Sequence, residues 1–299
     1  MTKVEANRRV RVRNILFATD FSENSLHAVQ YAMAVARQYE SRLVVAHVLR
    51  PDAYQVIPQD PTVLSDWFRR EADQQMASLL VSGVFRGVPH EVVMRQGSVW
   101  PALSEIVEEK EVDLIVLGTH GRTGIGKVML GSAAEEVFRH ATCPVLTVGP
   151  HVPGTSAPEA NFRRIVYATD ATTVPDDAAA YALSLAQEYG ARLTVIHAVR
   201  EMPGTWSDTP ARIQEEFINH LKQLVPPEVE SWCEPEFVVR FGEPAAEILD
   251  VANGRRADLI VLGVHGDVPL AGHRPATIAY KVVCEAHCPV LTVKGEKPS

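Results

Sequence analysis

The sequence predicts an α/β fold made of two tandem Rossmann-like, doubly wound domains, each with a five-stranded parallel sheet. Short runs of Val, Ile and Leu alternate with longer segments of helical period, and the runs are continuously apolar, as in strands covered by helices on both faces. The whole pattern occurs twice. Residues 14–20 (NILFATD) return as 164–170 (RIVYATD), and residues 113–121 (DLIVLGTHG) return as 258–266 (DLIVLGVHG).

The elements of the first copy follow in order from these patterns. The expected strands begin near Ile15, Leu43, Glu91, Leu114 and Val145. A helix is expected after the first strand, with Ser22 as its N-cap. Its apolar residues at helical spacing are Leu26, Val29, Met33 and Ala36. Residues 132–141 (SAAEEVFRHA) predict the helix before the last strand.

The join between the copies is residues 149–161 (GPHVPGTSAPEAN), whose Pro, Gly and Ser content is typical of an exposed linker. We therefore expect domains at residues 1–150 and 160–299, a repeat far longer than that of a solenoid.

Composition excludes several classes of function. The net charge of -8 argues against a general nucleic-acid binder. No apolar stretch reaches the roughly 18 to 20 residues of a membrane helix, and the first residues lack the apolar core of a secretory signal. The four cysteines are too few and too scattered for a disulfide scaffold. We expect a cytoplasmic protein without a nucleic-acid or membrane partner.

Cys284, His287 and Cys288 have a spacing that could hold a metal on one helix face. However, Cys288 precedes the strand sequence PVLTV just as Cys143 does in the first copy. A thiol packed at the start of a strand is therefore the preferred interpretation.

Residues 121–127 resemble a Walker A phosphate loop, but Val128 stands where that loop needs a hydroxyl for Mg²⁺. The segment also follows the fourth strand rather than the first, and the second copy has Ala271 and Gly272 in place of the Gly-Lys pair. The Walker interpretation is therefore disfavoured. What the copies share is Gly118, His120 and Gly121, matched by Gly263, His265 and Gly266.

A hydroxyl follows at the next helix, as Ser132 after Gly131 and as Thr277 after Ala276. A helix N-terminus presents backbone N–H groups to an anion, and glycines let backbone approach a ligand. The pattern favours a phosphate loop, although glycines that merely end a strand and start a helix are the alternative.

The spacing Gly118-x2-Gly121-x9-Gly131-Ser132 resembles the ATP-binding signature of the universal stress protein family. The resemblance covers both copies and includes residues 18–22 (ATDFS), 46–48 (AHV) and 143–148 (CPVLTV). It implies the strand order 3-2-1-4-5, in which ligands bind at the switch point between strands one and four.

The same resemblance implies roles for residues of the first copy. Adenosine would contact Ala18, Asp20 and Val48, and the phosphates would contact Gly118, Gly121, Gly131, Ser132 and the N–H of Ala133. Arg122 could add charge or remain solvated. His120 is expected to shape the loop, while His47 and His197 are expected to be packed walls. The second-copy counterparts are Ala168, Asp170, Ala198, Gly263, Gly266 and Thr277.

The second site is expected to be weaker. Ala276 replaces the glycine equivalent to Gly131, and Asp267 stands where the first copy has Arg122. If the backbone at that glycine were left-handed, alanine would cost ~1 to 2 kcal/mol, and a carboxylate would repel a phosphate.

These features predict an ATP-binding stress-response regulator without a catalytic residue of its own. Mg²⁺ would accompany the phosphates and contact Ser132, with slow ATP hydrolysis at most. An AMP or cyclic-AMP binding module is the alternative, and an adenylyl-transfer or pyrophosphatase-type enzyme is less favoured because residues 18–24 (ATDFSEN) lack the motif it needs after strand one. The resemblance further implies a protein partner of unknown identity, pairing of the two fifth strands within the chain, and a homodimer.

Overall fold

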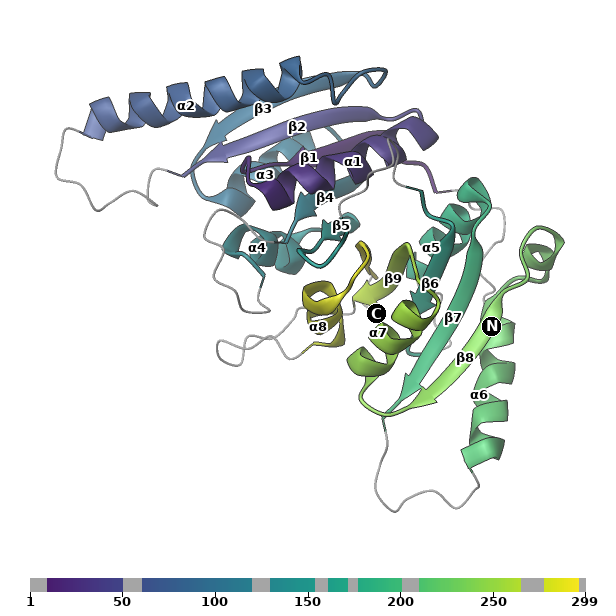
Figure 1. Cartoon of the computed structure of the whole chain (residues 1–299). Coiled ribbons are helices and arrows are strands. Elements are labelled where there is room, and N and C mark those ends of the chain that lie inside the picture. The colour runs from purple at the N-terminus through teal and green to yellow at the C-terminus, as the bar shows by residue number, and fades with distance from the viewer. Residues whose placement is uncertain are drawn as a thin grey trace. The chain divides into compact units, whose positions relative to one another are not determined.

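The computed structural model describes residues 10–50, 61–119, 130–153, 161–171, 177–200, 210–264 and 277–295. The chain divides into two compact units, one built mainly on Arg11–Pro150 and the other mainly on Asn161–Ser299. We call them the first and the second domain (Figure 1). Both alternate strands with helices, which confirms the tandem α/β fold.

The first domain holds five strands and four helices among its described residues. In order, they are β1 Asn14–Ala18, α1 Glu23–Gln38, β2 Arg42–Leu49, α2 Pro61–Val81, β3 His90–Gln96, α3 Val99–Glu109, β4 Leu114–Gly118, α4 Ser132–His140 and β5 Val145–Val148. Each strand begins within one residue of its expected start.

All strand pairs of the first domain are parallel, and they run in the order β3-β2-β1-β4-β5. This order is compatible with the one that the resemblance implies. The last residue of β1, Ala18, is in register with Ala46 of β2 and with Leu117 of β4. The carboxyl ends of the three central strands therefore meet at one edge of the sheet, which is where ligands bind in folds of this kind.

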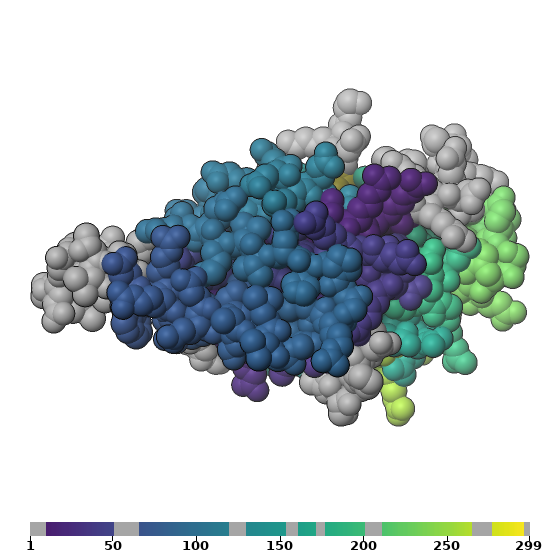
Figure 2. Space-filling model, turned by 90° about the horizontal axis from the view of Figure 1, so that it is seen from above, coloured from purple at the N-terminus to yellow at the C-terminus, as the bar shows by residue number. Residues whose placement is uncertain are grey.

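The core of the first domain lies on the central strands, where Ile15, Leu16 and Phe17 of β1 are fully buried. Helix α1 buries Val29, Met33 and Ala36 as expected, but Leu26 is 36% exposed, and Ser25 and Ala28 are the buried residues of that turn. Ser22 is the N-cap, because its Oγ accepts the N–H of Ser25 at 3.2 Å. In the space-filling view the blue atoms of α2 and β3 form a continuous face of this domain (Figure 2).

The second domain repeats the arrangement. Its elements are β6 Arg164–Ala168, α5 Asp177–Tyr189, β7 Arg192–Val199, α6 Pro210–Leu224, the 3₁₀ helix η2 Pro227–Ser231, β8 Glu236–Phe241, α7 Pro244–Gly254, β9 Leu259–Val264, α8 Ile278–Glu285 and β10 Val290–Lys294. Its strands pair in the order β8-β7-β6-β9-β10, again all parallel.

Equivalent helices of the two domains end in the same way but with different residues. After α1, Glu40 has φ 54°, and after α5 the left-handed position is Gly190, with φ 56°. In both, the next N–H reaches back into the helix: Ser41 donates to Ala36 O and Ala191 donates to Ala186 O, each at 2.8 Å. The first domain therefore places a glutamate where the backbone favours glycine.

None of the helices in the described part of the chain is both long enough and apolar enough to cross a membrane.

Candidate functional site

In each domain, the turn that follows the first strand, β1 or β6, contains a residue with a strained backbone. Phe21 has φ 62° and donates its N–H to Thr19 Oγ1 at 3.0 Å. Its counterpart Ala171 has φ 57° and donates to Thr169 Oγ1 at 3.1 Å. A left-handed non-glycine residue costs about 1 to 3 kcal/mol, and such strain clusters at functional sites. The threonine hydroxyl thus stabilises a turn of three residues. Its middle residue, between the threonine and the left-handed residue, is acidic.

Asp20 is that acidic residue, and it is oriented by the residues that follow it. Its Oδ1 accepts the N–H of Ser22 at 3.0 Å and the Ser22 hydroxyl at 2.6 Å. Ser22 in turn caps α1. These two bonds therefore hold the carboxylate in place at the carboxyl end of β1.

His47 of β2 forms a hydrogen bond that stabilises the same turn. Because a carbonyl only accepts, His47 Nδ1 carries the proton that it donates to Thr19 O at 2.7 Å. Its ring lies 4.5 Å from that of Phe21, between centroids. In the second domain His197 makes the same bond to Thr169 O at 2.9 Å and packs on Phe217. Both histidines thus form packed walls that position the turn, in line with the sequence interpretation.

Gly118 ends β4, and the structure gives its packing role. A Cβ at this position would lie 2.9 Å from the carbonyl oxygen of Asn24 and 3.0 Å from the nitrogen of Ser25. The absent side chain therefore lets the N-terminus of α1 approach β4. The sequence pattern predicts a glycine that lets a ligand approach or one that merely ends the strand, and neither interpretation includes this contact with α1.

Gly131 precedes α4 with φ −62° and ψ 150°, an extended conformation open to any residue. The condition on which a cost for alanine was considered, a left-handed backbone, is therefore not met at Gly131. Ala276 lies outside the described residues. Gly131 instead ties the loop closed, because its N–H donates to Thr119 O at 2.7 Å. Thr119 itself is fully buried and donates its N–H to Val148 O at 2.9 Å.

The helices that follow the two loops begin differently. In α4 the N-cap is Gly131 and no side chain caps the helix, so the first-turn N–H groups, that of Ala133 among them, face the edge of the sheet without a local acceptor from a cap. In α8 the N-cap is Thr277, whose Oγ1 accepts the N–H of Tyr280 at 3.2 Å. The start of α8 is thus satisfied by its own side chain, whereas the start of α4 is open to an external anion.

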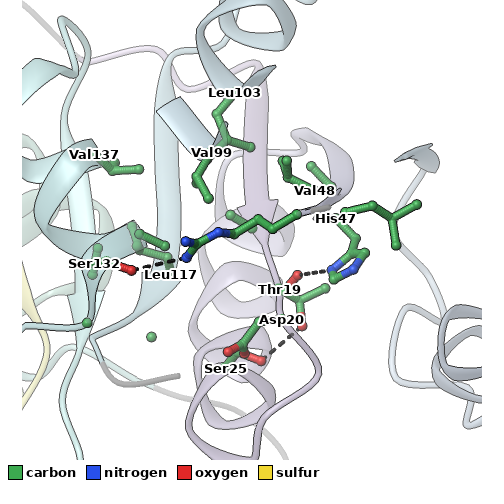
Figure 3. A pocket seen from close by; sticks show the side chains of 18 of the residues that line it. Thr19, Asp20, Ser25, His47, Val48, Val99, Leu103, Leu117, Ser132 and Val137 are labelled. Carbon is green, nitrogen blue, oxygen red and sulfur yellow. Dashed lines mark hydrogen bonds between the residues drawn. The ribbon is translucent and has the colours of Figure 1, made fainter. Parts of the chain in front are cut away.

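A pocket of about 450 Å³ lies at the carboxyl ends of β1, β2 and β4 (Figure 3). Seven residues singled out from the sequence line it together: Ala18, Asp20, Val48, Gly118, Gly131, Ser132 and Ala133. The labelled side chains show a polar group, with Thr19, Asp20 and Ser25, and an apolar group, with Val99 and Leu103. The pocket therefore offers separate surfaces for polar and apolar parts of a ligand.

Sequence reasoning missed several lining residues. The apolar ones come from α2, α3 and α4, and they include Phe68, Ala72, Val99, Leu103 and Val137. The charged ones are Glu71 of α2 and Arg50. Arg50 follows β2 and donates from Nη1 to Ser132 Oγ at 3.2 Å. A signal for it was present, because Arg200 follows β7 at the equivalent position of the repeat.

Some predicted site residues lie outside the described residues: His120, Gly121, Arg122 and Gly266. In the second domain Ala168, Ala198 and Gly263 lie in β6, β7 and β9 near the carboxyl ends, Asp170 follows β6, and Thr277 precedes α8. The arrangement of the first site's strands is therefore repeated.

The cysteine pattern considered for a metal gives no cluster among the described residues. Cys284 and Cys288 are buried free thiols. Burial raises the pKa of Cys288 to about 12 and that of its counterpart Cys143 to about 11. Thiols in such surroundings stay protonated at neutral pH, which suits packing rather than ligation.

Comparison with known proteins agrees with this architecture. A sequence model of the universal stress protein family matches residues 11–149 and again residues 161–294. A universal stress protein of Mycobacterium tuberculosis is 26% identical over 297 residues, which cover 94% of this chain and 96% of that protein. A universal stress protein of Methanocaldococcus jannaschii is 30% identical over 138 residues, 46% of this chain and 81% of the relative.

Among solved structures, a universal stress protein from Archaeoglobus fulgidus has the same fold, with a TM-score of 0.71 over 95% of this chain and 99% of that one at 20% identity. The family's sequence pattern fits both domains, and tandem relatives align with nearly the whole length. The chain therefore belongs to the universal stress protein family.

Proposed function

We propose that the first domain binds ATP, with Mg²⁺ on its phosphates, and that nucleotide occupancy regulates the binding of a protein partner. The observation that carries this proposal is the single pocket lined by Asp20, Val48, Gly118 and Ser132, which come from four separate segments of the sequence. Residues that the family resemblance assigns to one ligand thus share one cavity.

The two ends of the pocket suit the two ends of a nucleotide. Asp20, held by Ser22, can accept hydrogen bonds from adenosine, and Val48 and Leu103 offer apolar surface to its rings. At the other end, the uncapped start of α4 presents the N–H groups of Ser132 and Ala133 to phosphate oxygens.

The residues at this end also fit Mg²⁺. The ion keeps most of its waters and takes few protein ligands when it is bound together with phosphates. The Ser132 hydroxyl lies at the start of α4 and is exposed to the pocket, so it can serve as one such ligand. The ion supplies positive charge that offsets the negative charge of the phosphates.

Regulation follows from the closed base of the loop. Because the Gly131 N–H donates to Thr119 O, the two ends of the intervening segment are bonded to each other beside the pocket. Contacts between that segment and the phosphates would favour one conformation of the loop over others. The affinity of the protein for a partner that binds the loop would then change.

The second domain is proposed to bind nucleotide more weakly. The reason is the Thr277 cap, since a phosphate at the start of α8 competes with the hydroxyl that already accepts the Tyr280 N–H. A cap contributes about 1 kcal/mol, and each 1.4 kcal/mol is about tenfold in affinity. The difference expected from this cause is therefore several-fold to tenfold.

The test is to identify nucleotide released from the purified full chain by mass spectrometry, and to titrate the emptied protein with ATP, AMP and cyclic AMP in a calorimeter. We expect ATP in the released fraction and the highest affinity for ATP. Preference for AMP or cyclic AMP would replace this proposal with the alternative binding module. Stoichiometric release of pyrophosphate from ATP would instead point to an adenylyl-transfer or pyrophosphatase-type enzyme.

A further inference from the structure

Arg50 is a charged residue of the pocket that the family's motif does not include. It follows the last residue of β2, Leu49, and its side chain reaches to α4, where Nη1 donates to Ser132 Oγ at 3.2 Å. The dashed line at Ser132 in Figure 3 marks this bond. The guanidinium thus lies at the start of the helix whose N–H groups are proposed to hold phosphate.

The other charged residues of the pocket make the positive charge of Arg50 important for binding an anion. Among the described lining residues, Asp20 and Glu71 carry carboxylates, and Arg50 is the one with a permanent positive charge. A triphosphate brings several negative charges to the same space. With one Mg²⁺ bound, ATP still has a net negative charge, so repulsion from two carboxylates would oppose its binding unless a positively charged side chain lay nearby. An uncharged nucleoside would be unaffected.

The chemistry of the group matches the ligand. Arginine presents five N–H donors in a planar fork that fits phosphate oxygens, and its charge does not depend on pH in the physiological range. One donor already points to Ser132 Oγ, the hydroxyl proposed to approach the phosphates and Mg²⁺. A phosphate held by the first turn of α4 would therefore lie within reach of the same guanidinium.

We infer that Arg50 is a phosphate ligand of the first site, and that it makes this site select adenine ligands by phosphate charge. The inference rests on the proposed binding of nucleotide in this pocket. Arg50 and the start of α4 hold the phosphates from two elements, β2 and α4, so that adenosine alone gains only the contacts at the other end.

The experiment compares ATP, AMP and adenosine on the full chain and on Arg50→Met, which keeps much of the side-chain volume and removes the charge. Loss of a charged hydrogen bond predicts a roughly 10- to 100-fold weaker ATP affinity. The affinity for adenosine should change less than about twofold, and that for AMP should fall by an intermediate factor. Arg50→Lys, which keeps charge but loses the fork, should recover part of the ATP affinity.

Arg200→Met is the matched control, because this exposed arginine follows β7 at the equivalent place in the second domain. It should leave the tighter ATP site unchanged. Circular dichroism and thermal melting of every variant separate loss of binding from loss of fold.

Two results would overturn the inference while leaving the proposed function intact: unchanged ATP affinity in Arg50→Met, or an equal loss for adenosine and ATP. A different result addresses the proposed function itself. If the unmodified chain bound none of the three ligands, the nucleotide site would be wrong, and the role of Arg50 with it.

Discussion

Gly131 donates its backbone N–H to the carbonyl oxygen of Thr119 at 2.7 Å, so the two ends of the loop between β4 and α4 are bonded to each other. Thr119 is in turn bonded through its N–H to Val148 of β5. The start of α4 is thereby anchored to the sheet, with its first turn facing the pocket. The proposed phosphate contact at Ser132 would thus be made by an anchored helix start, which favours binding because little order has to be gained.

Two glycines that flank this loop, Gly118 and Gly131, are expected to respond differently to alanine. Gly118→Ala forces a Cβ against the Asn24 carbonyl at 2.9 Å, so α1 and β4 have to separate. Overpacking of this kind costs about 1 to 3 kcal/mol. Urea unfolding should show that loss. Gly131→Ala is the control, because its backbone is extended and the second copy carries Ala276 there. A comparable loss in both variants would show that Gly118 has no special packing role.

Glu40→Gly should stabilise the first domain by about 1 kcal/mol, because the left-handed backbone at φ 54° disfavours a side chain. The second domain provides the reverse experiment. Gly190→Ala, at φ 56°, should destabilise its domain by a similar amount. The measurement is the melting temperature of each variant compared with that of the unmodified chain. A lower melting temperature for Glu40→Gly would contradict the explanation.

The hydroxyls at the two helix starts should separate stability from binding. Thr277→Ala removes a cap and should cost about 1 kcal/mol of stability. Ser132→Ala removes no cap, so its stability should change by less than about 0.5 kcal/mol. Its ATP affinity should nevertheless fall, by about tenfold for one hydrogen bond. The measurements are urea unfolding and calorimetric titration, and the account fails if Ser132→Ala loses stability but keeps its affinity.

Alkaline pH should weaken the fold through the thiols of Cys143 and Cys288. Burial raises the pKa of Cys143 to about 11 and that of Cys288 to about 12, from an ordinary 9.0. Between pH 9 and those values the unfolded chain loses protons that the folded chain keeps, so the free energy of unfolding falls as pH rises. The slope is about 1.4 kcal/mol per pH unit for each thiol.

The double variant Cys143→Ala and Cys288→Ala serves as the comparison for that pH series. Its unfolding free energy should fall less steeply than that of the unmodified chain from pH 9 to pH 10. Identical slopes for the two proteins would show that these thiols do not titrate differently in the folded state.

The fold was predictable because its signals are local and occur twice. Continuous apolar runs located most of the strands, and Ser22 located the start of α1. The backbone at Gly131 was not predictable, because a glycine in a sequence does not reveal which of its allowed conformations is used. The role of Gly118 depends on how closely α1 approaches β4, a tertiary distance that spacing does not contain.

The site residues that belong to the family motif were predictable, whereas the other residues that line the pocket were not. Asp20, Val48 and Ser132 could be placed on one crevice from the strand order. Arg50 was missed, since a single arginine after a strand is most often solvated. Its repetition as Arg200 marks the position in the sequence, but its reach to Ser132 comes from the structure. The apolar wall from α2 and α3 depends on how those helices pack over the sheet.

The most direct test is calorimetric titration of ATP into the full chain and into two matched variants, Asp20→Ala and Asp170→Ala. These carboxylates occupy equivalent positions after β1 and β6. We expect the tighter site to be lost in Asp20→Ala and retained in Asp170→Ala. Retention of that site in Asp20→Ala, or an equal loss in both variants, would contradict ATP binding in the first-domain pocket.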